Sequence, residues 1–195
     1  MFDWELTSRA CMESDTERIA HGLRHKNVAV LEKLVEEYQY RLVRYLVSLL
    51  GRRDGVDDLV QETWLRVLER GASYDGRSRF EPWLFRVARN IALDAMRKPP
   101  MFSLDSDEED IFRSSPASSE PSPYALAART QDAERLAHSL EALETAFREA
   151  LMLRFQEDLS LQEISVVVGA PVSTVASRIY RGLATLRPQV EGDTA

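Results

Sequence analysis

The chain has 195 residues, of which 44% are hydrophobic and 29% are charged, and its net charge is −7. This composition supports one or two packed domains and excludes a wholly disordered or collagen-like chain. A single cysteine excludes an internal disulfide framework and a zinc site built from several cysteines. Because no apolar run approaches the roughly 18 residues of a membrane helix and no signal-peptide pattern is present, we expect a cytoplasmic protein without membrane insertion.

Residues 1–26 form an N-terminal extension that precedes the regular helical patterns. His21 and His25 are four residues apart, so a helix would bring them together, and Cys11 could join them at a metal ion. A fourth ligand is absent, and we therefore predict no metal and no cofactor. The extension is either a frayed arm or an arm that packs on a domain and regulates it.

Three helices are expected between residues 27 and 98. Apolar residues recur at helical spacing over 28–50 and 56–70, and a glycine follows each stretch as a suitable helix end. Residues 72–79 are typical of a loop. Pro82 suits the first turn of a third helix, because an N–H at that position needs no partner. No stretch alternates as a strand would, so the predicted fold class is all-α.

A change of composition marks residues 99–127 as a linker. The segment contains the acidic run Asp105–Asp110 and a stretch rich in serine and proline at 114–119. Such a composition buries too little apolar surface to offset the entropy of ordering. We therefore predict a flexible acidic linker between two small helical domains, at residues 27–98 and 128–190.

The second domain contains a predicted helix over 124–155 and then a helix-turn-helix at 160–187. Ser160 and Glu163 have the spacing of a capping box, which begins a short helix that ends at Gly169. A second helix is expected to end near Arg187, before Pro188. A helix, a glycine turn and a second helix are the helix-turn-helix arrangement. The two helices are expected to pack through five apolar residues: Ile164, Val168, Val175, Ile179 and Leu183.

Two basic segments stand out in this acidic chain. Arg77–Lys98 contains six basic and two acidic residues, and residues 171–190 contain three arginines and no acid. The first segment also contains aromatic residues, a combination suited to single-stranded DNA, although Trp83 and Phe85 are expected to lie in the core. In the second segment, hydroxyl groups and arginines at the start of a helix are suited to phosphates and guanine edges in a major groove. Two solvated helix faces and an ordinary helical hairpin are the alternatives.

Three motifs resemble bacterial sigma factors. Residues 57–65 (DDLVQETWL) resemble region 2.2, and residues 80–94 (FEPWLFRVARNIALD) resemble region 2.3 running into region 2.4. Residues 159–178, from LSLQEI to STVASR, resemble region 4.2. The motifs occur in the family's order with a linker between them. The short chain resembles the extracytoplasmic-function group of the sigma-70 family, over residues 27–98 and 128–188.

The resemblance implies a non-enzymatic subunit that binds core RNA polymerase and promoter DNA. The partners it implies within core polymerase are the beta-prime and beta subunits. It assigns core binding, with the polar face turned to the coiled coil of beta-prime, to the first motif: Asp57, Asp58, Leu59, Gln61, Glu62 and Leu65. It assigns the −10 element, including a base pocket in the loop 72–79, to that loop and the first basic segment: Tyr74, Arg77, Arg79, Arg86, Asn90, Arg97 and Lys98. It assigns the −35 element to the recognition helix: Ser173, Thr174, Ser177, Arg178, Tyr180 and Arg181. An anti-sigma factor is a further candidate partner.

The chain departs from the family pattern at two places. Ala176 stands where members often have a basic residue, so the base preference cannot be transferred. Leu143-Glu144-Thr145 replaces a common Leu-Pro, which would lengthen or merge helices. The acidic linker is either a solvated spacer or a mimic of nucleic acid.

Two other classes of protein compete with this interpretation. A free-standing helix-turn-helix regulator would need a dimer, and no dimer helix is visible. A metal-dependent phosphodiesterase using Asp57, Asp58 and Glu62 would need a partner cluster or a nucleophile, and neither accompanies them.

Overall fold

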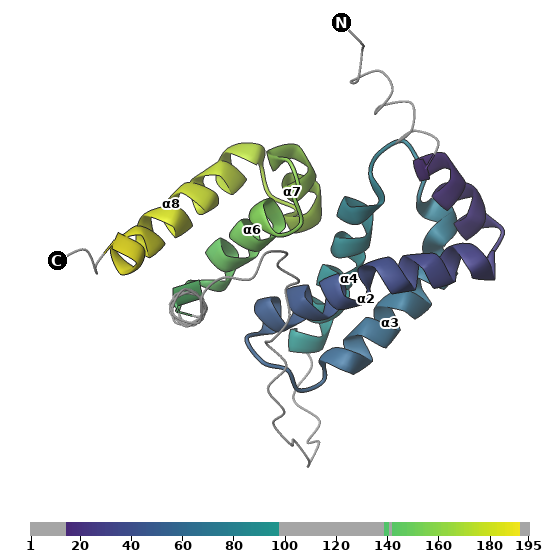
Figure 1. Ribbon diagram of the computed structural model, residues 1–195, viewed down its shortest axis with the longest axis horizontal. Coiled ribbons are helices and arrows are strands. Elements are labelled where there is room, and N and C mark those ends of the chain that lie inside the picture. The colour runs from purple at the N-terminus through teal and green to yellow at the C-terminus, as the bar shows by residue number, and fades with distance from the viewer. Residues whose placement is uncertain (1–14, 98–138, 141, 192–195) are drawn as a thin grey trace, which may run out of the picture.

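The computed structural model describes residues 15–97, 139–140 and 142–191 (Figure 1). Within these ranges every regular element is a helix, which confirms the predicted all-α class. None of the described helices is long and apolar enough to span a bilayer.

The first group of helices is α2 (Val28–Leu50), α3 (Val56–Arg70) and α4 (Phe80–Arg97), with a short 3₁₀ turn at Gly71–Ser73. Helix α2 begins where the Asn27 side chain accepts hydrogen bonds from two backbone N–H groups. It ends at Gly51, whose φ of 68° lies in the left-handed region that favours glycine. These caps explain why the bounds of α2 agree with the sequence prediction. We call residues 15–97 the N-terminal bundle.

Part of the N-terminal extension belongs to this bundle. Residues 15–24 are helical, and Ala20 and Leu23 are buried in its core. Gly76 has a φ of 75°, and a Cβ there would lie 2.9 Å from the Ala20 Cβ atom, so only glycine fits this contact. The frayed-arm alternative is therefore wrong for residues 15–24. Cys11 lies outside the described residues.

The second group of helices is α6 (Thr145–Phe155), α7 (Leu161–Val168) and α8 (Val172–Glu191), and we call residues 139–191 the C-terminal bundle. A turn at residues 142–144, held by the buried Leu143, separates α6 from helical residues 139–140. The predicted uninterrupted helix over 124–155 is therefore wrong at this turn. Residues 124–138 lie outside the described ranges.

The helix-turn-helix agrees with the prediction except at its second helix. Ser160 Oγ accepts a hydrogen bond from the Glu163 N–H, and Glu163 Oε2 accepts one from the Ser160 N–H, which completes the capping box. Helix α8 does not stop before Pro188, because a proline near the end of a helix removes only one N–H donor from the ladder. Leu183 is 44% exposed and is not buried between the helices as predicted.

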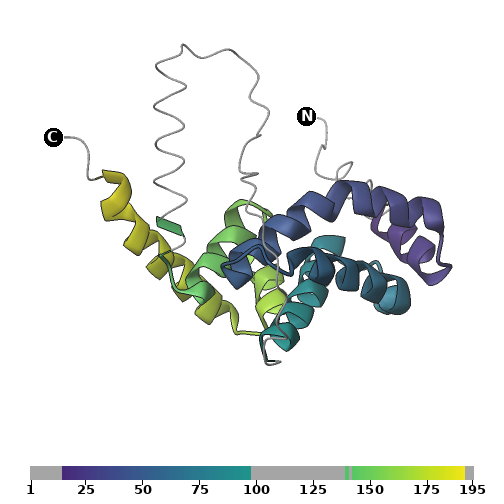
Figure 2. The same cartoon turned by 90° about the horizontal axis from the view of Figure 1, so that it is seen from below.

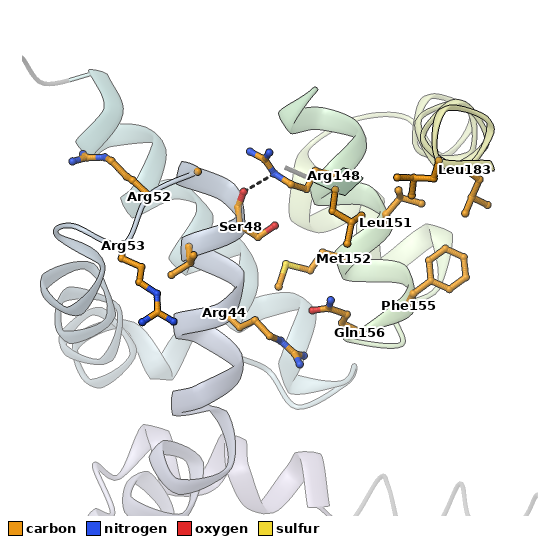
Figure 3. A pocket seen from close by; sticks show the side chains of 14 residues that line it. Arg44, Ser48, Arg52, Arg53, Arg148, Leu151, Met152, Phe155, Gln156 and Leu183 are labelled. Atoms are coloured by element: carbon orange, nitrogen blue, oxygen red, sulfur yellow. Dashed lines mark hydrogen bonds between the residues drawn. The ribbon is translucent and has the colours of Figure 1, made fainter. Parts of the chain in front are cut away.

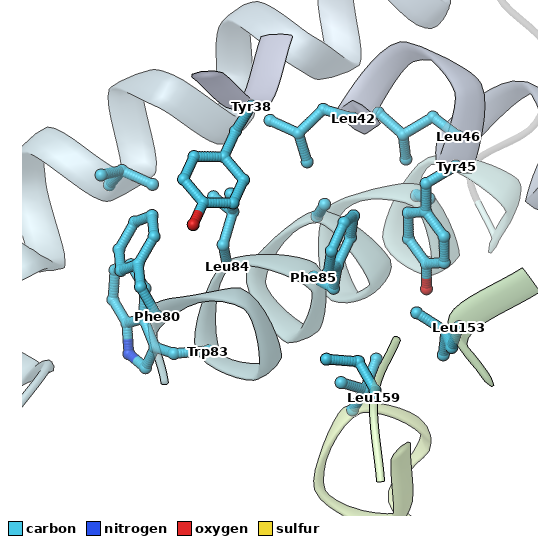
Figure 4. Packing of buried hydrophobic residues seen from close by; sticks show 14 of the residues in the cluster. Tyr38, Leu42, Tyr45, Leu46, Phe80, Trp83, Leu84, Phe85, Leu153 and Leu159 are labelled. Atoms are coloured by element: carbon cyan, nitrogen blue, oxygen red, sulfur yellow. The ribbon is translucent and has the colours of Figure 1, made fainter. Parts of the chain in front are cut away.

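The two bundles pack against each other. Helix α7 packs against α4, and α6 packs against α2, so the two bundles lie side by side (Figure 2). One apolar cluster continues across the boundary, where Leu153 and Leu159 of the C-terminal bundle face Tyr45 and Phe85 (Figure 4). Both leucines are fully buried, and burial of a leucine is worth about 1.5–3 kcal/mol. We call this arrangement the closed state.

Candidate nucleic-acid and protein interfaces

The outer face of α3 is open to solvent in the closed state. Asp57, Asp58 and Gln61 are exposed, and Leu65 is 56% exposed. Glu62 is half-buried and accepts a hydrogen bond from the arginine one turn later at 2.6 Å. The face therefore combines carboxylates, an amide and an apolar side chain, which suits binding to another protein.

The helix α3 keeps this face in place through its other side. Val60 and Val67 are buried in the core of the N-terminal bundle, and Leu59 packs partly against that core. Trp64 donates a hydrogen bond from Nε1 to Gln39 on α2 at 2.8 Å. Among the described residues, no group of three or more acids, histidines or cysteines could hold a metal ion.

Most candidate residues for the −10 element lie on the surface of α4 and the preceding loop. Arg77, Arg86, Asn90 and Arg97 are exposed. Lys98 lies outside the described residues. These side chains are available to a nucleic-acid backbone without a change in the fold.

Tyr74 is buried, in contrast to the exposed Arg77, Arg86, Asn90 and Arg97. Its hydroxyl donates to the Ser78 carbonyl oxygen at 2.6 Å, and its ring packs on Phe80 and Trp83 at 5.3 and 5.8 Å. Burial raises the pKa of the Tyr74 hydroxyl, with Glu81 adding to the effect. The loop 72–79 is thus closed on itself in this state.

Arg79 joins the loop to the C-terminal bundle. One guanidinium nitrogen donates to the Asp158 carbonyl oxygen at 3.1 Å, and another donates to Glu81 at 3.0 Å. Burial acts to lower the pKa of Arg79, but the hydrogen bond and charge of Glu81 outweigh it, and the pKa is raised. Arg79 is therefore charged and engaged between the bundles.

Trp83 and Phe85 are core residues, as the sequence indicated. Phe85 is fully buried and Trp83 is 8% exposed. The Phe85 ring meets the Tyr45 ring edge-on at 5.1 Å. Neither ring is available for stacking on bases in the closed state.

The candidate residues for the −35 element gather at the start of α8. Ser173, Ser177 and Arg181 are exposed and Tyr180 is 75% exposed. With Thr174 and Arg178, most of them line a shallow recess of about 370 Å³. Hydroxyl groups, guanidinium groups and the first turn of a helix therefore share one face, as binding to a DNA backbone and base edges requires.

The sequence did not reveal two buried carboxylates between the bundles. Glu149 on α6 is 4% exposed, and its carboxylate accepts from the Tyr45 hydroxyl at 2.8 Å and from Arg89 Nε at 2.7 Å. Burial raises the pKa of Tyr45 well above its ordinary value, and Glu149 adds to the effect. The tyrosine therefore stays protonated and donates to the carboxylate.

Glu157 forms the second buried contact. It is 1% exposed and accepts from Arg41 Nε at 2.7 Å and from Arg44 Nη2 at 3.0 Å. The Arg41 guanidinium also lies 4.7 Å from the centre of the Tyr38 ring. The signal for this contact is in α2, where two arginines interrupt an otherwise apolar stripe, but nothing local indicates the partner.

A groove with an apolar floor spans both bundles on one side of this contact (Figure 3). Its volume is about 580 Å³. Leu151 and Met152 contribute to the floor, and Phe155, which is 62% exposed, lies at its edge. Four arginines line the groove: Arg44, Arg52, Arg53 and Arg148.

Two family models match the chain. The model of sigma-70 region 2 matches residues 34–99, which include α3, α4 and most of α2. The model of sigma-70 region 4 matches residues 133–186, which include α6, α7 and most of α8.

Curated relatives carry the same family description. The chain is 33% identical over 163 residues to the ECF RNA polymerase sigma-E factors of Salmonella typhimurium and Escherichia coli, with 81% of this chain and 85% of those proteins covered. It is also 33% identical over 156 residues to the ECF RNA polymerase sigma factor SigE of Mycolicibacterium smegmatis. That match covers 80% of this chain and 60% of the length of the relative.

Solved structures with the same fold come from complexes. CnrH, solved with the cytosolic domain of CnrY, matches with a TM-score of 0.63 and 26% identity, covering 92% of this chain and 99% of that chain. RpoE of Bartonella quintana, solved with the anti-sigma factor NepR, matches with a TM-score of 0.62 and 21% identity, covering 83% and 97%. The second likeness concerns the fold alone.

Proposed function

Because the chain belongs to the extracytoplasmic-function group of the sigma-70 family, it is a promoter-directing subunit of RNA polymerase, and we propose which of its surfaces do this work. The subunit acts by binding in the cytoplasm and catalyses no reaction itself. The observation that supports the assignment best is the position of the matched regions. Region 2 presents an open face on α3, and region 4 presents a cationic face at the start of α8.

The α3 face binds core polymerase in this proposal. Asp58, Gln61 and Glu62 supply hydrogen-bond acceptors, and Leu65 supplies an exposed apolar contact. Charges at the rim of such an interface act mainly on orientation and on the rate of association. The beta-prime and beta subunits are the expected partners.

The −10 element binds α4 and the loop before it. Arg77, Arg86, Asn90 and Arg97 hold the backbone of the separated strand. Taking a base out of the stack costs a few kcal/mol. The closed loop around Tyr74 must open to accept that base, and the energy for this step comes from the complex with polymerase.

The −35 element binds the recess at the start of α8. Ser173, Thr174 and Ser177 are placed for phosphate oxygens, and Arg178 and Arg181 are placed for phosphates or guanine edges. Because Ala176 is half-buried and carries no polar group, base readout depends on its neighbours.

Co-elution with core polymerase in size-exclusion chromatography tests the assignment of α3. The Asp58→Ala/Gln61→Ala variant is expected to lose co-elution, whereas Glu36→Ala, an exposed change on α2, retains it. If both variants co-elute like the wild type, the α3 assignment is wrong. If the wild type itself does not bind, a free-standing regulator becomes the better explanation.

The groove between the bundles supports a second partner of the anti-sigma class. Its apolar floor and arginine lining suit an amphipathic helix with acidic residues along its edges. Of two proteins of the same fold, RpoE was solved with the anti-sigma factor NepR, and CnrH was solved with the cytosolic domain of CnrY. Phe155→Asp places a charge at the exposed edge of the groove and is expected to weaken binding of that partner while leaving polymerase binding intact.

A further inference from the structure

We infer that Glu149 and Glu157 substitute for a nucleic-acid backbone and cover a cationic surface of the N-terminal bundle, formed by Arg41, Arg44 and Arg89, until the bundles separate. We call these three arginines the covered arginines. The inference rests on the proposed function, because it assumes that the N-terminal bundle binds DNA. It adds three side chains to the DNA-binding surface and a reason for their concealment.

The geometry of the contacts is that of backbone recognition. Arg89 approaches Glu149 with Nε at 2.7 Å and Nη2 at 3.4 Å, and the two arginines of α2 share the carboxylate of Glu157. A guanidinium group binds carboxylates and phosphates with the same planar fork, so a surface that holds two carboxylates is also suited to phosphates.

The covered arginines also continue a surface that the proposed function already uses. Arg89 lies on α4 between Arg86 and Asn90, both of which are exposed. Arg79, at the start of the same helix, is likewise engaged by the C-terminal bundle through the Asp158 carbonyl oxygen. The closed state therefore occupies one part of the α4 surface and leaves the neighbouring part free.

The carboxylates do not satisfy the covered arginines completely. The Nε atom of Arg44 is buried and has no hydrogen-bond partner among the described residues. A buried donor without a partner is unfavourable, whereas phosphates arranged along a strand offer more acceptors than one carboxylate. Nucleic acid is therefore a more complete partner for this surface than the C-terminal bundle.

The closed state leaves the α3 face uncovered, so polymerase can bind before the bundles separate. Separation would then release the covered arginines at the moment when DNA is available. A ligand shifts such an equilibrium only if it binds one state better. DNA does so here because the covered arginines, whose side chains are 18–29% exposed in the closed state, are free of the two carboxylates in the open state alone.

The distance between the bundles can be measured without polymerase or promoter. Cysteines that replace the exposed Glu36 on α2 and Ala184 on α8, in a Cys11→Ser background, allow fluorescence energy transfer across the interface. Oligothymidylate added to the otherwise wild-type chain is expected to lower the transfer efficiency. Unchanged transfer at saturating DNA would overturn the inference, and this outcome does not depend on whether polymerase binds.

Variants test the role of the carboxylates. Glu149→Gln/Glu157→Gln is expected to lower the transfer without DNA and to strengthen oligothymidylate binding in fluorescence anisotropy. The matched control is Asp158→Asn, which removes a carboxylate that is 93% exposed next to Glu157. Because DNA holds the bundles open in both proteins, the same phosphates are contacted, and the gain comes from the lower cost of separating the bundles.

A third substitution separates a covered DNA surface from simple packing of the bundles. Adding Arg89→Ala to the double variant should reduce the gain in DNA affinity while the bundles stay apart. If the bundles separate but DNA affinity does not rise, the carboxylates hold the bundles together without concealing a DNA surface. Circular dichroism checks that the helices of each variant are intact.

Discussion

Two surfaces of the N-terminal bundle, the α3 face and the α4 surface, differ in whether the C-terminal bundle covers them. The α3 face, with Asp58 and Leu65, is open, whereas the α4 surface around Arg89 is covered by the C-terminal bundle. The open face is acidic and the covered one is basic. Under the proposed function, the difference separates two steps, because polymerase can bind while part of the DNA-binding surface is still occupied.

The largest effect is expected from uncovering α4 by a change in the apolar contact. Leu159 is fully buried beside Phe85, and Leu159→Ala should destabilise the contact by about 2–5 kcal/mol (Figure 4). The bundles would then unfold separately, which differential scanning calorimetry detects as two transitions in place of one. Phe155→Ala, at a residue that is 62% exposed, is the control. A single unchanged transition in Leu159→Ala would show that this leucine does not hold the bundles together.

Whether a feature of this structure could be predicted from the sequence depends on how far apart along the chain its residues lie. The bounds of α2 were predictable because Gly51 and the periodic apolar residues lie within the helix or beside it. The capping box of Ser160 and Glu163 was predictable for the same reason. Local patterns report local structure, and both features were found from spacing alone.

The contact between the bundles was not predictable in this way. Arg41 and Glu157 are 116 residues apart, and Tyr45 and Glu149 are 104 apart. Both acids would ordinarily be assigned to solvent, Glu149 on a helix face and Glu157 in the turn after that helix, since carboxylates are rarely buried without a partner. Leu183 shows the opposite error. Its spacing fits the hairpin and predicted burial, but the side chain lines the groove and is 44% exposed.

A second prediction concerns the support of the loop next to the covered surface. Gly76 in the loop 72–79 contacts residues 15–24 of the extension, and Gly76→Ala combines a φ of 75° with a Cβ atom 2.9 Å from Ala20. We expect a loss of about 1–3 kcal/mol and faster hydrogen exchange in residues 15–24. Gly55→Ala has the same φ but no neighbour within 4 Å, so it isolates the backbone strain. Equal effects of the two substitutions would mean that the contact with Ala20 contributes nothing.

A smaller effect is expected from the helix that covers α4. Ser160→Ala removes the side-chain cap of α7, at a cost of about 1 kcal/mol. Because α7 packs along α4, energy transfer between the bundles should fall slightly, while polymerase binding through α3 stays unchanged. Ser160→Asp restores an acceptor at the cap and should recover most of the loss. If Ser160→Ala weakens polymerase binding as much as it weakens the contact between the bundles, the α3 face and the α4 surface are not independent.

The smallest effect is expected from pH, through the hydroxyl that Tyr45 donates to Glu149. The pKa of Tyr45 is raised in the closed state by burial and by Glu149, so the protonated tyrosine favours closure. Its contribution is complete below the ordinary tyrosine pKa of about 10 and is lost as the pH rises above that value. At about pH 10.5 the loss is below about 1 kcal/mol. Energy transfer between the bundles should therefore decline above about pH 10 in the wild type.

Tyr38 and Tyr74 also have raised pKa values, but neither is hydrogen-bonded to the C-terminal bundle. Tyr45→Phe should therefore flatten the alkaline decline. If energy transfer declines equally in Tyr45→Phe, the decline reflects a loss of stability of the N-terminal bundle. The α4 surface would then be uncovered by unfolding of that bundle and not by separation of the two bundles.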